Sequence, residues 1–127
     1  MRKSIIIPND VRSKPSRDEI SAAYILLDYF EADIKFIPRR GIKTPDFLIK
    51  GKYWELKSPT GNGKRNLQHT VTRALAQSQN IIIDARNSKI DMTKIQNFLR
   101  NEASKNKRIK SLLLIDKQKK VVEIVER

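Results

Sequence analysis

Three residues with chemically useful side chains lie near the middle of the chain: Asp46, Glu55 and Lys57. Glu55 and Lys57 are two positions apart, so in a β-strand they lie on the same face. Asp46 opens the preceding apolar run, and Lys50-Gly51 between the two runs is typical of a tight hairpin turn. Such a hairpin brings Asp46 back beside the second strand. We therefore expect two carboxylates and an ammonium to converge at one edge of a sheet.

This set of side chains predicts a metal site for phosphodiester hydrolysis. Two carboxylates ~4 Å apart repel each other by about 4 kcal/mol at an effective dielectric near 20. Lys57 offsets part of this repulsion, and a divalent cation offsets more. Mg²⁺ is the expected ion, because it prefers carboxylate oxygens and keeps several waters, and Mn²⁺ takes the same ligands. The carbonyl of Leu56 would add an oxygen, and Lys57 would orient the water or stabilise charge on the phosphate.

A solvated hairpin with a surface ion pair is the alternative interpretation. Glu-x-Lys is a common triplet in a chain with 27 Lys and Arg residues. Its placement favours a site, because Pro45-Asp46 opens a strand, a glycine turn follows, and the triplet stands on the paired strand beside Trp54.

A helix predicted over residues 65–78 carries a polar face with little charge. The members of this face are spaced i, i+4, i+7 and i+11, namely Asn66, Thr70, Arg73 and Gln77. Three of these four are uncharged, although a solvated face in so basic a chain should carry more charge. We expect the face to line the site, with Arg73 near the scissile phosphate. An ordinary solvated face is the alternative.

The remaining patterns predict the elements that position these residues. Ser16 and Glu19 have capping-box spacing and open a helix that ends near residue 30. Strands are expected at 34–37, 47–49, 52–58, 81–84, 112–115 and 121–125, and Asp91 caps a helix running to residue 105. Residues 5–7 form an edge strand or a tail. The order predicts one α/β domain over residues 1–127, with a mixed sheet flanked by helices, a core at about 16–85 and a C-terminal helix and hairpin at 91–125.

The formal net charge of +13 indicates a polyanionic partner. Nucleic acid is favoured over a membrane, because no basic amphipathic helix carries bulky apolar anchors, and plain solubility is the alternative. The chain has no Cys and one His, which argues against disulfides, thiolate sites and a His-rich zinc site. The cations expected to hold the nucleic-acid backbone are Lys64, Arg65, Arg39, Arg40 and Lys43. A second basic cluster at 105–110 has the default interpretation of a solvated helix end.

Pro45-Asp46 together with Glu55-Leu56-Lys57 resembles the motif of the PD-(D/E)xK phosphodiesterase superfamily. The order of elements over residues 16–85 also resembles the core of that superfamily. More narrowly, residues 55–61, the following helix with Gln77 and residues 81–84 are similar to C-terminal toxin domains of contact-dependent growth inhibition (CdiA) proteins, many of which are tRNA nucleases.

The resemblance implies a metal-dependent endonuclease with Asp46 and Glu55 as metal ligands and Lys57 as a catalytic residue. Gln77 matches a position often used near that lysine. Glu19 matches an acidic residue that often reaches the metal, although it is also the capping-box Glu. RNA, and tRNA in particular, is the implied substrate. DNA and a non-catalytic nucleic-acid-binding module are the alternatives.

The narrower resemblance also implies how such a protein works in a cell. It implies a cognate immunity protein as a partner. Action in the cytoplasm is expected, after delivery from a secreted parent toxin or as a free-standing protein.

Overall fold

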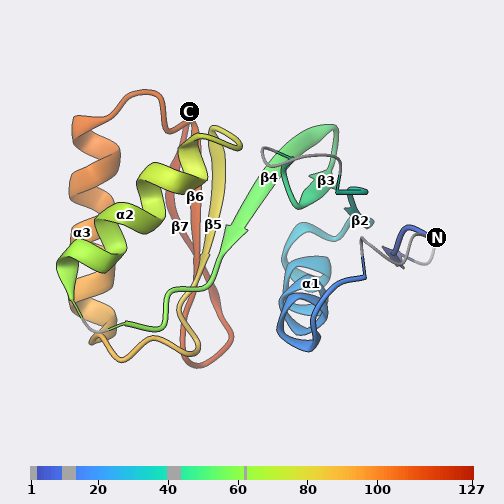
Figure 1. The fold of residues 1–127 in the computed structure, drawn as a ribbon, viewed down its shortest axis with the longest axis horizontal. Coiled ribbons are helices and arrows are strands. Elements are labelled where there is room, and N and C mark those ends of the chain that lie inside the picture. The colour runs from blue at the N-terminus through green and yellow to red at the C-terminus, as the bar shows by residue number, and fades with distance from the viewer. Residues whose placement is uncertain (1–2, 10–13, 40–43, 62) are drawn as a thin grey trace.

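A seven-stranded mixed sheet forms the centre of the computed structural model, which describes residues 3–9, 14–39, 44–61 and 63–127 (Figure 1). Its strands follow one another in chain order: β1 (Ile5–Ile6), β2 (Ile34–Phe36), β3 (Phe47–Ile49), β4 (Lys52–Lys57), β5 (Asn80–Asp84), β6 (Ser111–Ile115) and β7 (Val121–Glu126). The pairs β1–β2, β4–β5 and β5–β6 are parallel, and the others are antiparallel. The predicted α/β class with a mixed sheet is confirmed.

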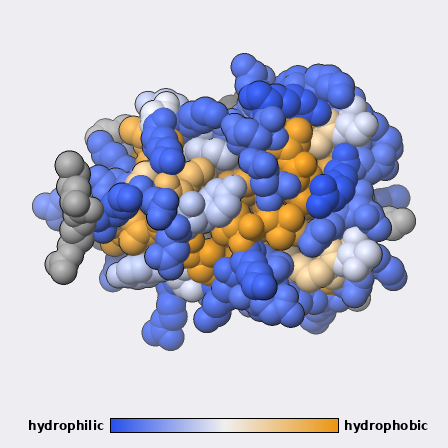
Figure 2. Space-filling model, turned by 180° about the vertical axis from the view of Figure 1, so that it is seen from behind, coloured by the Kyte–Doolittle hydropathy of each residue, from blue (hydrophilic) through white to orange (hydrophobic). Residues whose placement is uncertain are grey.

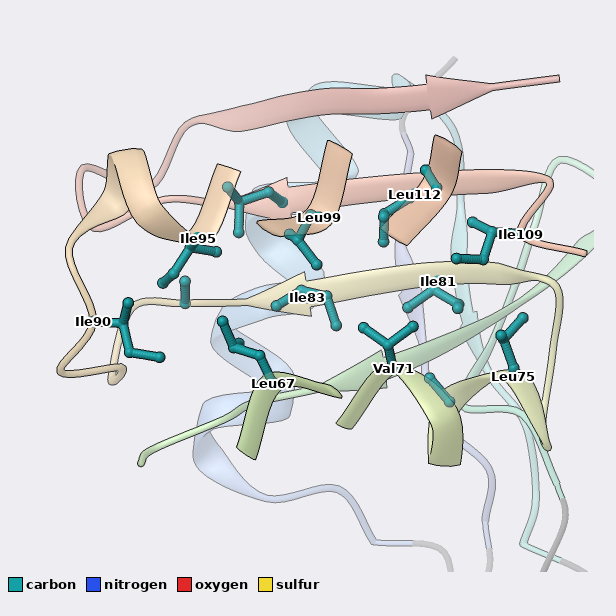
Figure 3. Packing of buried hydrophobic residues seen from close by; sticks show 14 residues of the cluster. Leu67, Val71, Leu75, Ile81, Ile83, Ile90, Ile95, Leu99, Ile109 and Leu112 are labelled. Carbon is teal, nitrogen blue, oxygen red and sulfur yellow. The ribbon is translucent and has the colours of Figure 1, made fainter. Parts of the chain in front are cut away.

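Three helices cover the two faces of this sheet: α1 (Arg17–Phe30), α2 (Lys64–Leu75) and α3 (Met92–Lys105). The strand β5 shows how the faces are divided, because its side chains alternate. Ile81 and Ile83 pack with α2 and α3, whereas Ile82 belongs to the cluster that includes the buried residues of α1. Figure 3 shows Leu67 and Val71 of α2 and Ile95 of α3 pointing into the first cluster.

The other side of the sheet is covered by one helix. Seen from behind, polar side chains surround a central area of hydrophobic ones (Figure 2). The buried residues of α1 and Ile82 belong to the cluster on this side. Half-buried hydrophobic side chains packed against it include Ile25 of α1 and Val121 of β7. Among the described residues, no helix is long and apolar enough to cross a membrane.

The helix α1 begins where the sequence predicts. The Ser16 hydroxyl accepts a hydrogen bond from the Glu19 N–H at 3.1 Å, and the Glu19 carboxylate accepts one from the Ser16 N–H at 2.8 Å. This capping box satisfies two backbone donors that the first turn leaves free. The helix ends at Phe30, where Glu31 adopts a left-handed conformation with φ 50°. The capping box thereby holds Glu19 in the first turn of α1.

The hairpin of β3 and β4 also follows the prediction. Lys50 and Gly51 have φ values of 50° and 78°, which is the turn geometry that matches the twist of two-residue hairpins. The register pairs Ile49 with Lys52 and Phe47 with Trp54. Continued by one residue, this register sets Asp46 across from Glu55.

The predicted C-terminal end of the second helix is wrong. The helix α2 ends at Leu75, not at residue 78, because the N–H groups of Gln77 and Ser78 both donate to the Ala74 carbonyl, at 2.9 and 3.0 Å. The Ser78 hydroxyl then donates to the Tyr53 carbonyl of β4 at 2.7 Å, which draws the chain toward the sheet. Gln77 therefore lies just beyond the helix instead of on its polar face.

A buried ion pair ties α1 to the sheet. Asp84, at the end of β5, accepts hydrogen bonds from Arg86 at 2.9 Å from Nε and 2.7 Å from Nη2. The same guanidinium donates to the Ser21 hydroxyl at 2.6 Å and to the Asp18 carbonyl at 3.2 Å, both on α1. Arg86 thus links the end of a central strand to the first turns of α1, from which Glu19 projects.

We expect Arg86→Leu to destabilise the fold by about 3–5 kcal/mol, because it leaves the carboxylate of Asp84, which is 2% exposed, without its cation. Urea unfolding followed by circular dichroism measures the change. Lys52→Met is the matched control, because it breaks the exposed Lys52–Glu126 pair and should cost less than about 1 kcal/mol. Equal losses in the two variants would contradict the anchoring role of Arg86.

Candidate active site

A polar pocket of about 410 Å³ lies where the start of α1, the segment before β3, the strand β4 and the turn after α2 meet. Its lining residues are Glu19, Arg39, Thr44, Asp46, Glu55, Leu56, Lys57 and Gln77. The structure therefore brings together all the residues that were predicted as catalytic or metal-binding. Thr44 was not predicted, and its nearness to Asp46 in the sequence was the signal that could have found it.

The Asp46 carboxylate is positioned by the end of the hairpin ladder. The Asp46 N–H donates to the Trp54 carbonyl at 3.0 Å, and its own carbonyl accepts from the Ile37 N–H at 3.0 Å. The Leu56 N–H donates to Asp46 Oδ2 at 2.8 Å. A side chain has thus replaced a backbone carbonyl as the acceptor for β4. The hydrogen bond from Leu56 holds the Asp46 carboxylate beside β4, next to Glu55.

The Glu55 carboxylate is the most buried charged group of the pocket, at 4% exposed. Lys57 Nζ lies 3.1 Å from Glu55 Oε2, as expected for two residues on one face of a strand. The other carboxylate oxygen, Oε1, is buried and has no hydrogen-bond partner among the described residues. Trp54 and Leu56 alternate with this pair and pack into the core with α1. Oε1 of Glu55 is therefore available to a proton or a cation, and Asp46 is close enough to share a hydrogen bond with Glu55.

A smaller hollow of about 160 Å³ adjoins the pocket, and Lys57 lines both. The other lining residues are Ser58, Pro59, Thr60, Asn66, Thr70 and Arg73. The predicted polar face of the second helix is therefore divided, because Gln77 lines the pocket and the other three members line the hollow. Ser58 and Thr60 were not predicted, although they follow Lys57 directly in the sequence.

The remaining predicted cations lie outside these cavities or outside the described residues. Arg65 is exposed on α2 and lines neither the pocket nor the hollow. Arg40, Lys43 and the side chain of Lys64 lie outside the described residues. Their contribution to nucleic-acid binding stays a prediction.

Residues 43–121, well over half of the chain, match the family of contact-dependent growth inhibition CdiA C-terminal domains. The chain belongs to this family. Its fold is similar to that of a chain from the "CdiA-CT/CdiI toxin and immunity complex from Burkholderia pseudomallei", with a TM-score of 0.67 and 18% sequence identity. The similarity covers 94% of this chain and 97% of that chain. No curated protein sequence matches this CdiA C-terminal domain.

The pocket of this CdiA C-terminal domain holds two carboxyl groups with raised pKa values, those of Asp46 and Glu55. Burial, and after it the charge of Asp46, raises the pKa of Glu55 from 4.5 to about 8, and Lys57 opposes these two effects only in part. Burial also raises the pKa of Asp46, against the hydrogen bond from the Leu56 N–H. Close like charges cannot both ionise easily. The pair therefore retains a proton near neutral pH.

The carboxyl pair fits a hard divalent cation. Asp46 and Glu55 offer oxygen ligands, one Glu55 oxygen has no described partner, and a cation would take the place of the retained proton. Among the described residues, no group of three or more His, Cys, Asp or Glu residues gathers as a metal site. A bound ion would complete its coordination with water, as Mg²⁺ commonly does.

Glu19 has the structural role that its spacing allowed. It accepts from the Ser16 N–H, and Arg39 Nη2 lies 3.1 Å from its Oε2. Its charge also contributes to raising the pKa of Asp46. Its capping role is present, and its predicted role as a metal ligand stays a prediction.

We expect Glu55→Gln to stabilise the domain relative to the parent increasingly between about pH 5 and pH 8 in EDTA. In the unfolded chain Glu55 ionises near its ordinary pKa of 4.5, but in the folded domain it holds its proton to about pH 8. The folded state binds more protons in this range, so the parent loses stability as the pH rises. Thermal unfolding across this range measures the effect.

Glu123→Gln is the control, because it removes one exposed carboxylate and reports only the change in overall charge. The melting temperature of this control should follow that of the parent. A constant offset between Glu55→Gln and the parent at every pH would contradict the raised pKa.

Proposed function

We propose that this CdiA C-terminal domain is a metal-dependent endonuclease with a PD-(D/E)xK core that hydrolyses phosphodiester bonds in nucleic acid. RNA, and tRNA in particular, is the proposed substrate, with DNA as the alternative. The observation that carries the proposal is the placement of the buried carboxyl group of Glu55 and the half-buried one of Asp46 beside Lys57 in one polar pocket. Metal-dependent hydrolysis of a phosphodiester bond brings the attacking water, the metal ion and a charge-stabilising group together at one point.

The residues of the pocket have distinct roles in this proposal. Asp46 and Glu55 would hold Mg²⁺ or Mn²⁺, which when bound supplies Lewis acidity and a water of lowered pKa. Lys57, held at 3.1 Å from Glu55, orients the attacking water or stabilises charge on the phosphate. Gln77 lines the same pocket from the turn after α2 and contributes a polar contact to the reacting group.

Cations around the pocket favour a polyanionic substrate. Arg39 lies at the rim of the pocket with its side chain 54% exposed, and Arg73 lines the neighbouring hollow. Together with the net charge of +13, they would neutralise phosphates and release counterions on binding. The guanidinium of Arg73 suits a phosphate because it can donate two parallel hydrogen bonds.

The family and the similar complex support a toxic role. Because that complex pairs a toxin with its immunity protein, we propose that this domain has a cognate immunity protein. Delivery from a secreted parent protein and action in the cytoplasm of a target cell complete the proposal. A membrane is not the proposed partner.

We expect the purified domain to cut tRNA in Mg²⁺ and to cut nothing in EDTA. Glu55→Ala and Lys57→Ala should each lower the cleavage rate by about 10²–10⁴-fold, because each removes a group that acts at the reacting phosphate. Incubation with tRNA, ribosomal RNA and plasmid DNA, followed by denaturing electrophoresis, measures cleavage and identifies the substrate.

Lys52→Ala is the matched control for Lys57→Ala, because it removes a lysine of β4 from a Lys–Glu pair away from the pocket. It should cut as the parent does. If Glu55→Ala cuts as fast as the parent, or if nothing is cut with metal, the enzyme proposal fails. Salt-dependent binding that ignores both substitutions would instead indicate a non-catalytic nucleic-acid-binding module.

We also expect Mg²⁺ to raise the melting temperature of the parent at pH 8 by a few degrees. At ten times its Kd, an ion that binds only the folded state stabilises it by about 1.4 kcal/mol. Glu55→Gln should lose most of this increase, whereas Glu123→Gln should keep it. An equal increase in all three proteins would contradict a site at the carboxyl pair.

A further inference from the structure

We propose that the hollow beside Lys57 binds a ribose of the substrate and that Thr70 accepts a hydrogen bond from its 2′-hydroxyl. This inference rests on the proposed function and names its substrate class, because a 2′-hydroxyl distinguishes RNA from DNA. It assigns to Thr70 the role of a specificity-determining residue.

The hydroxyl group of Thr70 is oriented to accept a hydrogen bond from a ligand. It is buried in α2, with the residue 4% exposed, and it donates its hydrogen to the Asn66 carbonyl at 2.8 Å. Its oxygen lone pairs remain, and no described residue donates to them. While Thr70 keeps its bond to the Asn66 carbonyl it offers a ligand only its lone pairs, and a phosphate oxygen has no hydrogen to donate to them. A sugar hydroxyl has one.

Thr72 shows why the position of Thr70 matters. Its hydroxyl makes the same bond one turn back, to the Gln68 carbonyl at 2.9 Å, but Thr72 is exposed and water can donate to it. Thr70 lines the hollow, where a ligand would displace water. A buried acceptor left without a donor costs more than an exposed one. A ligand with a donor at this point is therefore favoured.

The rest of the hollow suits the phosphate that accompanies a ribose. Lys57 and Arg73 supply cations that donate to phosphate oxygens, and Ser58 adds a hydroxyl. The volume of about 160 Å³ equals about five waters at ~30 Å³ each, which accommodates a sugar but not a base pair. Since Lys57 also lines the pocket, this ribose would lie next to the reacting phosphate.

Binding of three uridine 12-mers tests the inference without cleavage. The protein carries Glu55→Gln, and fluorescence anisotropy at one fixed salt concentration gives the Kd of ribo-, 2′-deoxy- and 2′-fluoro-oligonucleotides. The 2′-fluoro strand keeps a ribose-like sugar pucker but has no hydrogen to donate. We expect it and the 2′-deoxy strand to bind about tenfold more weakly than the ribo strand, the range for an unpaired buried acceptor.

Three further substitutions in the same background locate the effect. Thr70→Val keeps the shape of the side chain and should bind all three strands with one Kd. Thr70→Ser keeps the hydroxyl and should retain the tenfold preference, and Thr72→Val should retain it as well. Thermal unfolding checks that each variant is folded, and loss of the preference in folded Thr70→Ser would also contradict the role of the Thr70 hydroxyl.

Two results would overturn the inference. One is equal binding of the ribo and 2′-fluoro strands by the Glu55→Gln protein, which would show that the protein does not recognise the 2′-hydroxyl as a hydrogen-bond donor. The other is a preference for the ribo strand that persists in folded Thr70→Val, which would show that another residue recognises the 2′-hydroxyl. Neither depends on catalysis, so a failure here is distinguishable from a failure of the nuclease proposal, which the cleavage assay decides.

Discussion

The burial of Glu55 beside Asp46 is the constraint on which the rest of the site depends. A carboxyl group at 4% exposure loses most of its hydration, and a second carboxyl across the hairpin adds repulsion. Lys57 compensates for only part of this, because it pairs with one oxygen of Glu55. The fold therefore holds a group whose favourable partner is a proton or a cation, which is how a protein keeps a site ready for ligand.

That group is held in place jointly by β4, α1 and the turn after α2. The backbone of β4 gives its Leu56 N–H to Asp46, while α1 contributes Glu19 and the turn after α2 contributes Gln77. The Asp84–Arg86 pair joins α1 to the end of β5 by hydrogen bonds, which anchors the pocket wall built by α1 to the sheet. The pocket is thus a junction of elements that each have their own anchor.

The basic charge of the chain is distributed so that the carboxyl pocket lies among cations. Arg39 at the rim and Arg73 in the hollow are both exposed. They line different cavities, so each can contact a phosphate of its own. A substrate that spans pocket and hollow would place one phosphate at the carboxyl pair and a neighbouring sugar at Thr70. Affinity would come from the cations and selectivity from the buried acceptor.

The sequence by itself determined the elements and the central motif. The Ser16–Glu19 spacing, the Lys50-Gly51 turn and the alternation around Glu55 act over a few residues, so local rules were sufficient to predict α1, the hairpin and the shared face of Glu55 and Lys57. Only the tertiary structure decided the Arg39–Glu19 pair, the end of α2 at Leu75 and the separation of Thr70 from Gln77. These depend on contacts between distant segments, such as Ser78 with Tyr53, whose energies no local pattern contains.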